Sequence, residues 1–460
     1  MNKIIQQSLE IISTGFEKNI KNLMEKGQDI SEFVIATQKD LNSVGLALVS
    51  EALEKADERI KSGKERKKEW NVKEKAAENT LATIFGQVHY ARTYYVHKKT
   101  KEYKYLSDEM LGISVYDKMD LSLKAKLVEE AVESPYRRSG KKATEALEIS
   151  GQSVMNTIRE IGSIANDEAK YKAVNKDAKV LYVEVDEDHV SLQNGKTAEP
   201  KLVYVHEGLK LKGKGRFELI NPRYFGGMYS KSDELWLEVS DYINEFYDYE
   251  KLKKIYVSGD GARYIKNGAK WINKGVYVFD RYHLMKYIKQ AAGHIENGER
   301  EVWKALKEHD KEYLKIVFDT VESATLDNRR LETSHEASKC IMDNFESTRH
   351  HYADDYGGCS AEGHVSHIYA DRMSSRPLGW SKKGVDQMSR LRVFKKNGGD
   401  IYAMMLKNKS EIKKEKVIEI ENRKISNLRK KVASGETLGN IEVLNIGRCN
   451  GIQKALKSLR

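Results

Sequence analysis

The hydrophobic pattern of the N-terminal part of the chain predicts helices interrupted by a β-hairpin. Over residues 1–60 apolar side chains such as Leu9 and Ile12 recur every three or four positions, which is typical of amphipathic helices. Residues 80–106 are instead rich in β-branched and aromatic residues around a turn-like KKTKE, so we expect a β-hairpin there. Residues 121–170 return to a helical pattern.

Residues 139–162 have the layout of a helix-turn-helix motif. The apolar spacing predicts two helices joined by a tight turn at 149–151, with Ser150 as the N-cap of the second helix. The polar side chains of that second helix would face outward, suited to base edges and phosphates. They are Gln152, Ser153, Asn156 and Arg159. Two helices joined by a glycine turn are equally common in proteins that do not bind DNA.

The expected hairpin mixes aromatic rings with cations, as a DNA-facing β-ribbon would. Arg92 and Lys98 are its candidate DNA contacts. An ordinary amphipathic hairpin accounts for the same residues.

From residue 178 onward, short apolar runs alternate with helical segments, which indicates an α/β domain. We predict strands in VLYVEV, KKIYVSGDGA and GVYVFD, and two more in KLVYVHEGLKLKGKGRFELIN around a Gly/Lys turn. Helices are predicted in WLEVSDYINEFY, in RYHLMKYIKQAA, throughout 295–350, and in a later segment that ends at Pro377. The charged stretch at 411–431 predicts a helix that faces solvent or a partner.

The net positive charge of the chain indicates a polyanionic partner. The chain has 80 Lys and Arg against 69 Asp and Glu, a formal net charge of +11. Nucleic acid is the first candidate partner for such a balance. No run of about 18 uncharged apolar residues is present, which excludes a transmembrane helix.

The sequence also indicates a reducing compartment. The N-terminal stretch carries a charge within its apolar residues and lacks a small-residue cleavage site, so we expect no secretory signal. The three cysteines, Cys340, Cys359 and Cys449, are scattered and have no zinc-binding spacing. We therefore expect a cytoplasmic protein.

Acidic residues gather on one of the most hydrophobic predicted strands. Because successive side chains of a strand point to opposite faces, Glu184, Asp186 and Asp188 would share one face while Val183 and Val185 occupy the other. Buried carboxylates repel one another unless a cation compensates them. A solvated strand face is the alternative.

Further carboxylates stand where predicted elements begin or end. Asp260 follows a strand and lies between Gly259 and Gly261, and Glu362 opens a helix. Two divalent ions about 3.5–4 Å apart, held by such acids, can stabilise the attacking and leaving oxygens of a phosphoryl displacement. Asp260 is otherwise a turn residue, and Glu362 otherwise complements its helix dipole. Asp280 is read as a helix N-cap that could also lie beside the metals.

Four ordered motifs carry a resemblance to a known family. LYVEVDEDHVSLQ, YVSGDGARYIKNGAKWI, VFDRYHLMKYI and AEGHVSHIYADRMSSRPLGWSKKGVDQMSRLR resemble the insertion-sequence DDE transposases of the Lre-two family. That family was long catalogued as an uncharacterised conserved bacterial protein and is distantly similar to Mutator-like transposases. Two upstream stretches, FGQVHYARTYY and YKYLSDEMLGIS, also resemble its N-terminal region.

The resemblance implies a ribonuclease-H-like α/β catalytic domain over 176–400, with a helical insertion at about 290–350. A helical region over 1–75 and a DNA-binding region over 76–175, with the hairpin and the helix-turn-helix, would precede it, and a basic helical tail over 401–460 would follow.

The resemblance also implies the site and the reaction. Asp186, Asp260 and Glu362 would be the catalytic, metal-binding triad, with Asp188, and more weakly Glu184, as competitors for the first position. The cofactor would be Mg²⁺ or Mn²⁺. The partners would be double-stranded DNA, as terminal inverted repeats and target, and further copies of the chain in a synaptic complex. Arg372 and Trp380 would be structural or DNA-contacting.

Two other functions remain open. A metal-dependent nuclease of the same fold would cut DNA without joining it. A domesticated, catalytically inactive transposase would bind specific DNA sequences only. The transposase reading places the protein in the bacterial cytoplasm, associated with the nucleoid.

Overall fold

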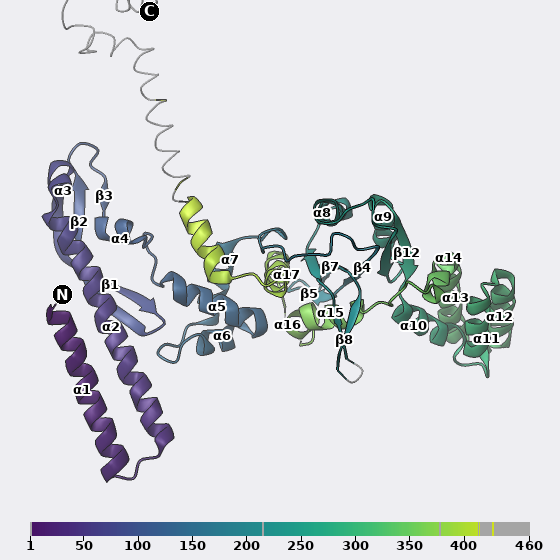
Figure 1. The fold of residues 1–460 in the computed structure, drawn as a ribbon, viewed down its shortest axis with the longest axis horizontal. Helices are drawn as coiled ribbons and strands as arrows, with labels where there is room; N and C mark the ends of the chain where they lie inside the picture. Colours follow the sequence, from purple (N-terminus) through teal and green to yellow (C-terminus); the bar gives the residue numbers. More distant parts are fainter. Residues whose placement is uncertain (1, 214–215, 377–378, 413, 415–425, 427–460) are drawn as a thin grey trace, which may run out of the picture. The chain divides into compact units, whose positions relative to one another are not determined.

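The computed structural model describes residues 2–213, 216–376, 379–412, 414 and 426 (Figure 1). The chain divides into two compact units, Met1–Ile401 and Tyr402–Arg460. In the second unit residues 402–412 are helical, and most of the charged helix expected at 411–431 lies outside the described residues.

The N-terminal region begins with a helical hairpin, as the pattern predicts. Helices α1 (Asn2–Glu25) and α2 (Ile30–Ser62) run side by side and are followed by the short α3 (Lys64–Glu69) (Figure 1). The carboxylate of Asp29 caps α2 by accepting the Ser31 backbone N–H at 2.8 Å.

The expected turn at KKTKE between two antiparallel strands is confirmed, but a longer hairpin that was not predicted precedes it. Strands β1 (Trp70–Thr83) and β2 (Gly86–His97) pair antiparallel around a turn at 84–85, where Gly86 adopts a positive φ of 131°. The KKTKE segment is a second turn, which leads from β2 into β3 (Tyr103–Lys104). The sequence pattern did not predict the first half of β1, because most of its residues are polar and exposed and apolar residues do not alternate with polar ones throughout it.

The predicted first helix of the helix-turn-helix is wrong. Helix α4 (Leu106–Leu111), α5 (Leu121–Glu133) and α6 (Tyr136–Lys142) precede α7 (Gly151–Ile161), and residues 143–150 between α6 and α7 are irregular. Thr144 donates its hydroxyl to the Ile84 carbonyl at 2.7 Å and accepts from Ala146, which competes with helical hydrogen bonding. Eight residues therefore join the helices, instead of a tight turn.

The second helix of that motif is confirmed. Ser150 is the N-cap of α7, and its hydroxyl accepts the Ser153 N–H at 3.1 Å, while Val154 and Ile158 are buried. We expect Ser150→Ala to lower the free energy of unfolding by about 1 kcal/mol, because a helix N–H loses its partner. Urea denaturation would measure this, and Ser150→Asp, which retains an acceptor, should stay close to wild type.

A five-stranded mixed sheet forms the centre of the α/β region, in the order β10-β7-β4-β11-β12. The central strand β4 runs parallel to β11, and β11 parallel to β12, whereas β7 is antiparallel to both β4 and β10. The strands are β4 (Val180–Glu187), β7 (Lys201–His206), β10 (Arg223–Gly227), β11 (Lys254–Gly259) and β12 (Gly275–Phe279).

Four shorter strands of the described chain form two separate two-stranded sheets. The segment in which we expected two strands contains β7 and a separate hairpin of β8 (Leu209–Gly213) and β9 (Arg216–Leu219), whose turn lies outside the described residues. Strands β5 (Val190–Ser191) and β6 (Thr197–Ala198) form another short pair. Strand β10, in RYFGG, was not predicted because two glycines weaken the pattern.

One face of the sheet packs against helices α8 (Ser232–Phe246) and α9 (Arg263–Trp271). Leu181, Val183 and Val185 of β4 are fully buried in this core beside Trp236 of α8. The apolar half of β4 thus lies where strand alternation places it. The other half, with Glu184 and Asp186, faces the opposite side and is also buried.

A helical segment follows β12, as predicted for 295–350. Its helices share a second core with Phe279 and comprise α10 (Arg281–Ala292), α11 (Gly298–Glu308), α12 (Lys311–Ala324), α13 (Asn328–Asp343), α14 (Phe345–Thr348) and the 3₁₀ turn η1 (Arg349–Tyr352).

The chain then returns to the sheet. Helix α15 (Ala361–Val365), the π-helical turn η2 (Ser366–Ala370) and α16 (Asp371–Met373) are continuous, and α17 (Lys382–Lys396) follows. The helix we expected to end at Pro377 ends at Met373, and Pro377 lies outside the described residues.

Two buried arginines join this segment to α5. Arg372 is 4% exposed, donates to the Ala131 carbonyl at 2.9 Å and stacks over Trp380 at 5.0 Å. Arg392 donates to the carbonyls of Val132, Ile368 and His367. Arg372 and Trp380 therefore have structural roles. In the part of the chain that the structure describes, no helix has the length and apolarity to cross a bilayer.

Candidate active site

The parallel register of β4 and β11 brings two of the predicted acids together. Ser258 of β11 lies opposite Glu184 of β4. Continuing this register by two residues places Asp260 opposite Asp186. Both acids lie at the carboxyl ends of adjacent parallel strands, the edge at which open α/β sheets bind ligands.

The third parallel strand adds another carboxylate at the same level. Gly259 of β11 lies opposite Phe279 of β12, so the next pair in register is Asp260 and Asp280. The Asp280 backbone N–H donates to the Gly259 carbonyl at 2.8 Å, which continues the ladder. Asp280 is also the N-cap of α10, as predicted, and accepts the His283 N–H at 3.1 Å.

The electrostatics of His283 support this clustering. Its Nδ1 lies 2.8 Å from Asp280 Oδ2. Burial alone would lower the pKa of His283, but the hydrogen bond and charge of Asp280, together with the charges of Asp186 and Asp260, raise it above its ordinary value. The field of all three aspartates thus converges on one imidazole at the ends of the strands.

Glycines make the turn at Asp260 possible. Gly261 has a φ of 95°, which favours glycine, and Asp260 Oδ1 accepts the Ala262 N–H at 2.9 Å. A Cβ on Gly259 would lie 2.6 Å from an Ile265 methyl carbon. Asp260 is therefore both a turn residue and a carboxylate at the strand edge, so the two interpretations are compatible.

Glu362 lies in α15, and its side chain is outside the described part of the chain. Its helix begins immediately after Ser360, whose backbone N–H donates to Glu184 Oε2 at 2.5 Å. The start of α15 is thereby attached to the strand that carries Asp186.

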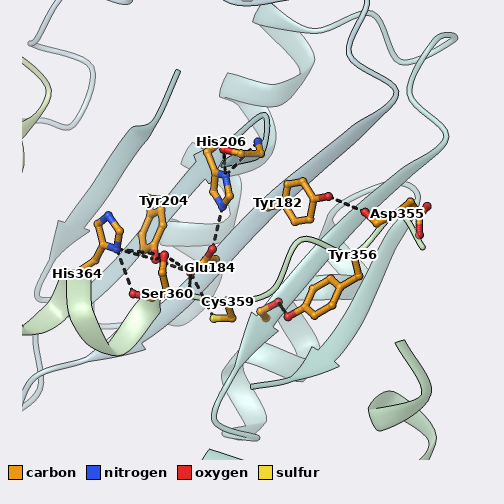
Figure 2. Close-up of polar contacts among 11 residues, drawn as sticks. Tyr182, Glu184, Tyr204, His206, Asp355, Tyr356, Cys359, Ser360 and His364 are labelled. Atoms are coloured by element: carbon orange, nitrogen blue, oxygen red, sulfur yellow. Dashed lines mark hydrogen bonds and ion pairs between the residues drawn. The ribbon is translucent and has the colours of Figure 1, made fainter. Parts of the chain in front are cut away.

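Glu184 is the centre of a buried hydrogen-bond network on that strand (Figure 2). It is 1% exposed and contacts Tyr204 Oη at 2.5 Å and His206 Nε2 at 2.9 Å. Burial alone would raise the pKa of Glu184, but the hydrogen bond and charge of His206, with the hydrogen bonds of Tyr204 and Ser360, lower it. His364 Nδ1 extends the network to Tyr204 at 3.2 Å.

The sequence pattern did not predict the hydrogen-bond network around Glu184. Tyr204 and His206 alternate on β7, so they share a face, and β7 is the neighbour of β4. That alternation was the available signal, but strand pairing was needed to connect it to Glu184.

Asp188 follows the end of β4 and is 7% exposed. It accepts the Ser374 hydroxyl at 2.8 Å and the His189 N–H at 2.9 Å. Burial raises the pKa of Asp188 despite these bonds. Of these two donors, His189 is the adjacent residue and Ser374 belongs to the segment after α16.

Asp186 and Asp260 are oxygen donors of the chemical type that magnesium prefers. Mg²⁺ prefers carboxylate oxygens, keeps several waters, and needs only one or two protein carboxylates alongside substrate phosphates. Asp186 and Asp260 supply such a pair. Within the described residues, no group of three or more His, Cys, Asp or Glu has the arrangement of a complete metal site.

Comparison with known proteins identifies the family. The uncharacterised protein family UPF0236 matches residues 23–410. The chain belongs to the UPF0236 family.

Relatives within UPF0236 are close and numerous. A UPF0236 protein of Caldanaerobacter subterraneus subsp. tengcongensis is 41% identical over 443 residues, covering 95% of this chain and 93% of its own length, and its name spans four loci. Another from that organism is 38% identical and spans eleven loci. A UPF0236 protein in the vanSb 3′ region of Streptococcus gallolyticus is 25% identical, covering 82% of this chain and 86% of its own length.

A solved structure, the Drosophila P element transposase strand transfer complex, is 11% identical and covers 64% of this chain and 82% of its own, with a TM-score of 0.22.

The candidate DNA-binding residues of this UPF0236 chain differ in their surroundings. On α7, Gln152, Asn156 and Arg159 are exposed, whereas Ser153 is half-buried and contacts Ser150. Their outward placement agrees with the sequence reading.

The hairpin candidates have intramolecular partners. Arg92 forms an ion pair with Asp108, is 16% exposed and stacks 3.6 Å from the Tyr105 ring centroid. Lys98 donates to the Lys67 carbonyl at 2.7 Å. DNA binding by residues of α7 and the hairpin stays a prediction.

Burial of His351 in η1 predicts that the stability of the protein depends on pH. Burial, reinforced by the charge of Arg281, lowers the pKa of His351 to about 4. The unfolded chain therefore binds an extra proton between pH 6.5 and 4, and stability falls as pH falls through that window. We expect His351→Phe to remove up to about 3 kcal/mol of this acid destabilisation. Denaturant titrations at several pH values would measure this effect. If the free energy of unfolding depended on pH equally in His351→Phe and wild type, His351 would not be the source of the acid destabilisation.

Proposed function

We propose that this chain is a DNA transposase with a ribonuclease-H-like catalytic domain, which uses divalent metal ions to cleave the ends of an insertion sequence and join them to target DNA. The observation that carries the proposal is the parallel pairing of β4 and β11 up to Ser258 and Glu184, because the same register continued by two residues sets Asp260 opposite Asp186. In such an edge, carboxylates are placed to bind divalent ions and a phosphate together.

The arrangement of the domain supports the proposal. The sheet is mixed, with β4 central and helices packed on it, and a helical segment separates β12 from α15, the helix of Glu362. A helical insertion before the last acid is what the resemblance to Lre-two transposases implies. The occurrence of relatives at four and eleven loci of one genome is typical of a mobile element.

The proposed mechanism assigns each residue a task. Asp186, Asp260 and Glu362 would hold Mg²⁺ or Mn²⁺, with Asp280 beside them as the cap of α10. The bound ions would stabilise the charge that develops on the phosphate and favour ionisation of the attacking water or 3′-hydroxyl. Positioning and charge stabilisation would supply most of the acceleration.

Lysine and arginine side chains would bind the DNA backbone, consistent with a net charge of +11. Two DNA ends must meet for joining, so we propose that the chain acts as a homo-oligomer on DNA, in the cytoplasm at the nucleoid.

The test is a cleavage and strand-transfer assay on a labelled duplex carrying the ends of the element. We expect nicking at the end in Mg²⁺ or Mn²⁺, followed by joining to a second duplex. Nicking without joining would establish the nuclease instead. Binding to the ends without cleavage would favour a domesticated DNA-binding protein.

DNA affinity should fall steeply with salt. If about six lysines and arginines neutralise phosphates, the association constant should drop by about 10³-fold between 50 and 200 mM salt. In a plot of log K against log salt concentration, Arg159→Ala should make the negative slope shallower by about 1, because it deletes one phosphate contact. Fluorescence anisotropy at several salt concentrations would measure both, and a flat response would contradict a basic DNA surface.

A further inference from the structure

The segment that leads into α15 has no regular structure of its own. Residues 356–360 form neither helix nor strand. Side chains of the sheet hold the segment in place (Figure 2). Tyr182 of β4 donates to the Asp355 carbonyl at 2.6 Å, and Ser258 of β11 contacts Tyr356 Oη at 3.0 Å.

Glu184 makes the last of these attachments before the helix. Its Oε2 accepts the Ser360 backbone N–H at 2.5 Å, the Ser360 hydroxyl at 3.2 Å and the Cys359 thiol at 3.3 Å. Because a loop backbone has no ladder to fix it, these bonds determine where α15 starts relative to β4.

The spacing along the chain connects this attachment to the proposed site. Glu184 lies two residues before Asp186 on the same face of β4, and Ser360 lies two residues before Glu362. Two residues of strand extend about 7 Å, and two of helix about 3 Å. The hydrogen bond therefore joins the two segments within two residues of each acid.

The bonding of Glu184 argues against its being a metal ligand itself. A carboxylate offers about four lone-pair sites. Here Oε2 already contacts Tyr204, Ser360 and Cys359, and Oε1 contacts His206 at 2.9 Å. A metal ion would have to displace buried protein donors, each costly to leave unpaired.

We infer that Glu184 is a positioning residue: its carboxylate holds the start of α15, the helix to which Glu362 belongs, against β4 and so beside the proposed metal site that includes Asp186. This inference rests on the proposed function, because it depends on the role of Glu362 there. Residues that orient metal ligands typically change metal affinity or activity by 10–100-fold when they are replaced.

The attachment can be tested without an activity assay. Amide hydrogen exchange is carried out on the full chain and is followed in the proteolytic fragment that covers residues 356–366. We expect Glu184→Ala to speed exchange of the Ser360 amide by at least about tenfold. Glu184→Gln should keep most of the protection, because its amide oxygen can accept from Ser360 while its NH₂ group faces His206. If the alanine variant does not fold, Glu184→Met removes the acceptor with nearly the same volume.

The consequence is tested by Mn²⁺ titration calorimetry and by the Mg²⁺ dependence of DNA-end cleavage. We expect Glu184→Ala to weaken Mn²⁺ binding, and to raise the Mg²⁺ concentration for half-maximal cleavage, by about 10–100-fold. Gel-shift affinity for the DNA ends should not change. Glu184→Gln should remain within about threefold of wild type, a rescue that a metal ligand would not allow.

The outcomes separate the two proposals. A folded Glu184→Ala protein with wild-type Mn²⁺ affinity would overturn the positioning role and leave the transposase intact. Equal loss of Mn²⁺ affinity in the glutamine and alanine variants, with Ser360 still protected in the glutamine variant, would make Glu184 a ligand and also overturn it. A wild-type chain that neither binds Mn²⁺ nor cleaves DNA would overturn the proposed function itself, whatever the exchange rates.

Discussion

Replacing Asp260 by asparagine is expected to lower the rate of metal-dependent cleavage at the DNA end by about 10³-fold or more. The change keeps the size of the side chain and the acceptor for the Ala262 N–H, but removes the negative charge beside Asp186. Losing about 4 kcal/mol of transition-state stabilisation corresponds to this factor. Single-turnover cleavage of a labelled DNA end in Mg²⁺ measures it.

The control for this experiment is Asp241→Asn. Asp241 is exposed on α8, the helix packed against the opposite face of the sheet. We expect wild-type cleavage from this variant, and wild-type DNA affinity from both. If Asp260→Asn cleaved as fast as wild type, Asp260 would not be a catalytic ligand and the transposase proposal would lose its central observation.

Trp236→Ala should produce the largest loss of stability, about 3–5 kcal/mol. Trp236 is fully buried between the sheet and α9, and its indole Nε1–H donates to the Tyr264 carbonyl at 3.0 Å. A Cβ on Gly268 would lie 1.9 Å from the indole, so the ring fills the space that this glycine leaves. The substitution therefore creates a cavity and removes the hydrogen bond from the indole to the Tyr264 carbonyl.

Urea denaturation monitored by circular dichroism measures this change. Leu237→Ala is the matched control, because Leu237 is the next residue of α8 and is 46% exposed. We expect the control to change the free energy of unfolding by less than about 0.5 kcal/mol. Similar losses in both variants would show that helix propensity, and not core packing, determines the stability of this layer.

Local patterns in the sequence predicted most of the elements. The apolar runs of β4, β11 and β12 and the helical spacing of α8 and α10 are signals within a few residues, and the structure has elements at each. Alternation along β4 also predicted that Glu184 and Asp186 share a face opposite Val183 and Val185. Such inferences succeed because they follow from backbone geometry alone.

Errors arose where distant contacts outweigh local preference. The residues after α6 have helical spacing, yet Thr144 bonds to Ile84 and the Ile149 N–H bonds to the Gly140 carbonyl, so the segment is irregular. A Cβ on Gly140 would lie 1.9 Å from the Ile149 carbonyl oxygen, which shows how closely the segment folds back. Contacts across 60 residues of sequence are not legible in a local pattern.

The sequence by itself determined which carboxylates stand at the ends of strands, because a strand's period and its glycine-flanked end are local properties. Only the tertiary structure decided that β4, β11 and β12 are adjacent and parallel, so that Asp186, Asp260 and Asp280 lie at the same edge of the sheet, since strand pairing joins segments separated along the chain. It also decided the role of Glu184, whose partners lie between 20 and 176 residues away in sequence. A buried carboxylate takes its function from the donors around it, and those donors are assembled only by folding.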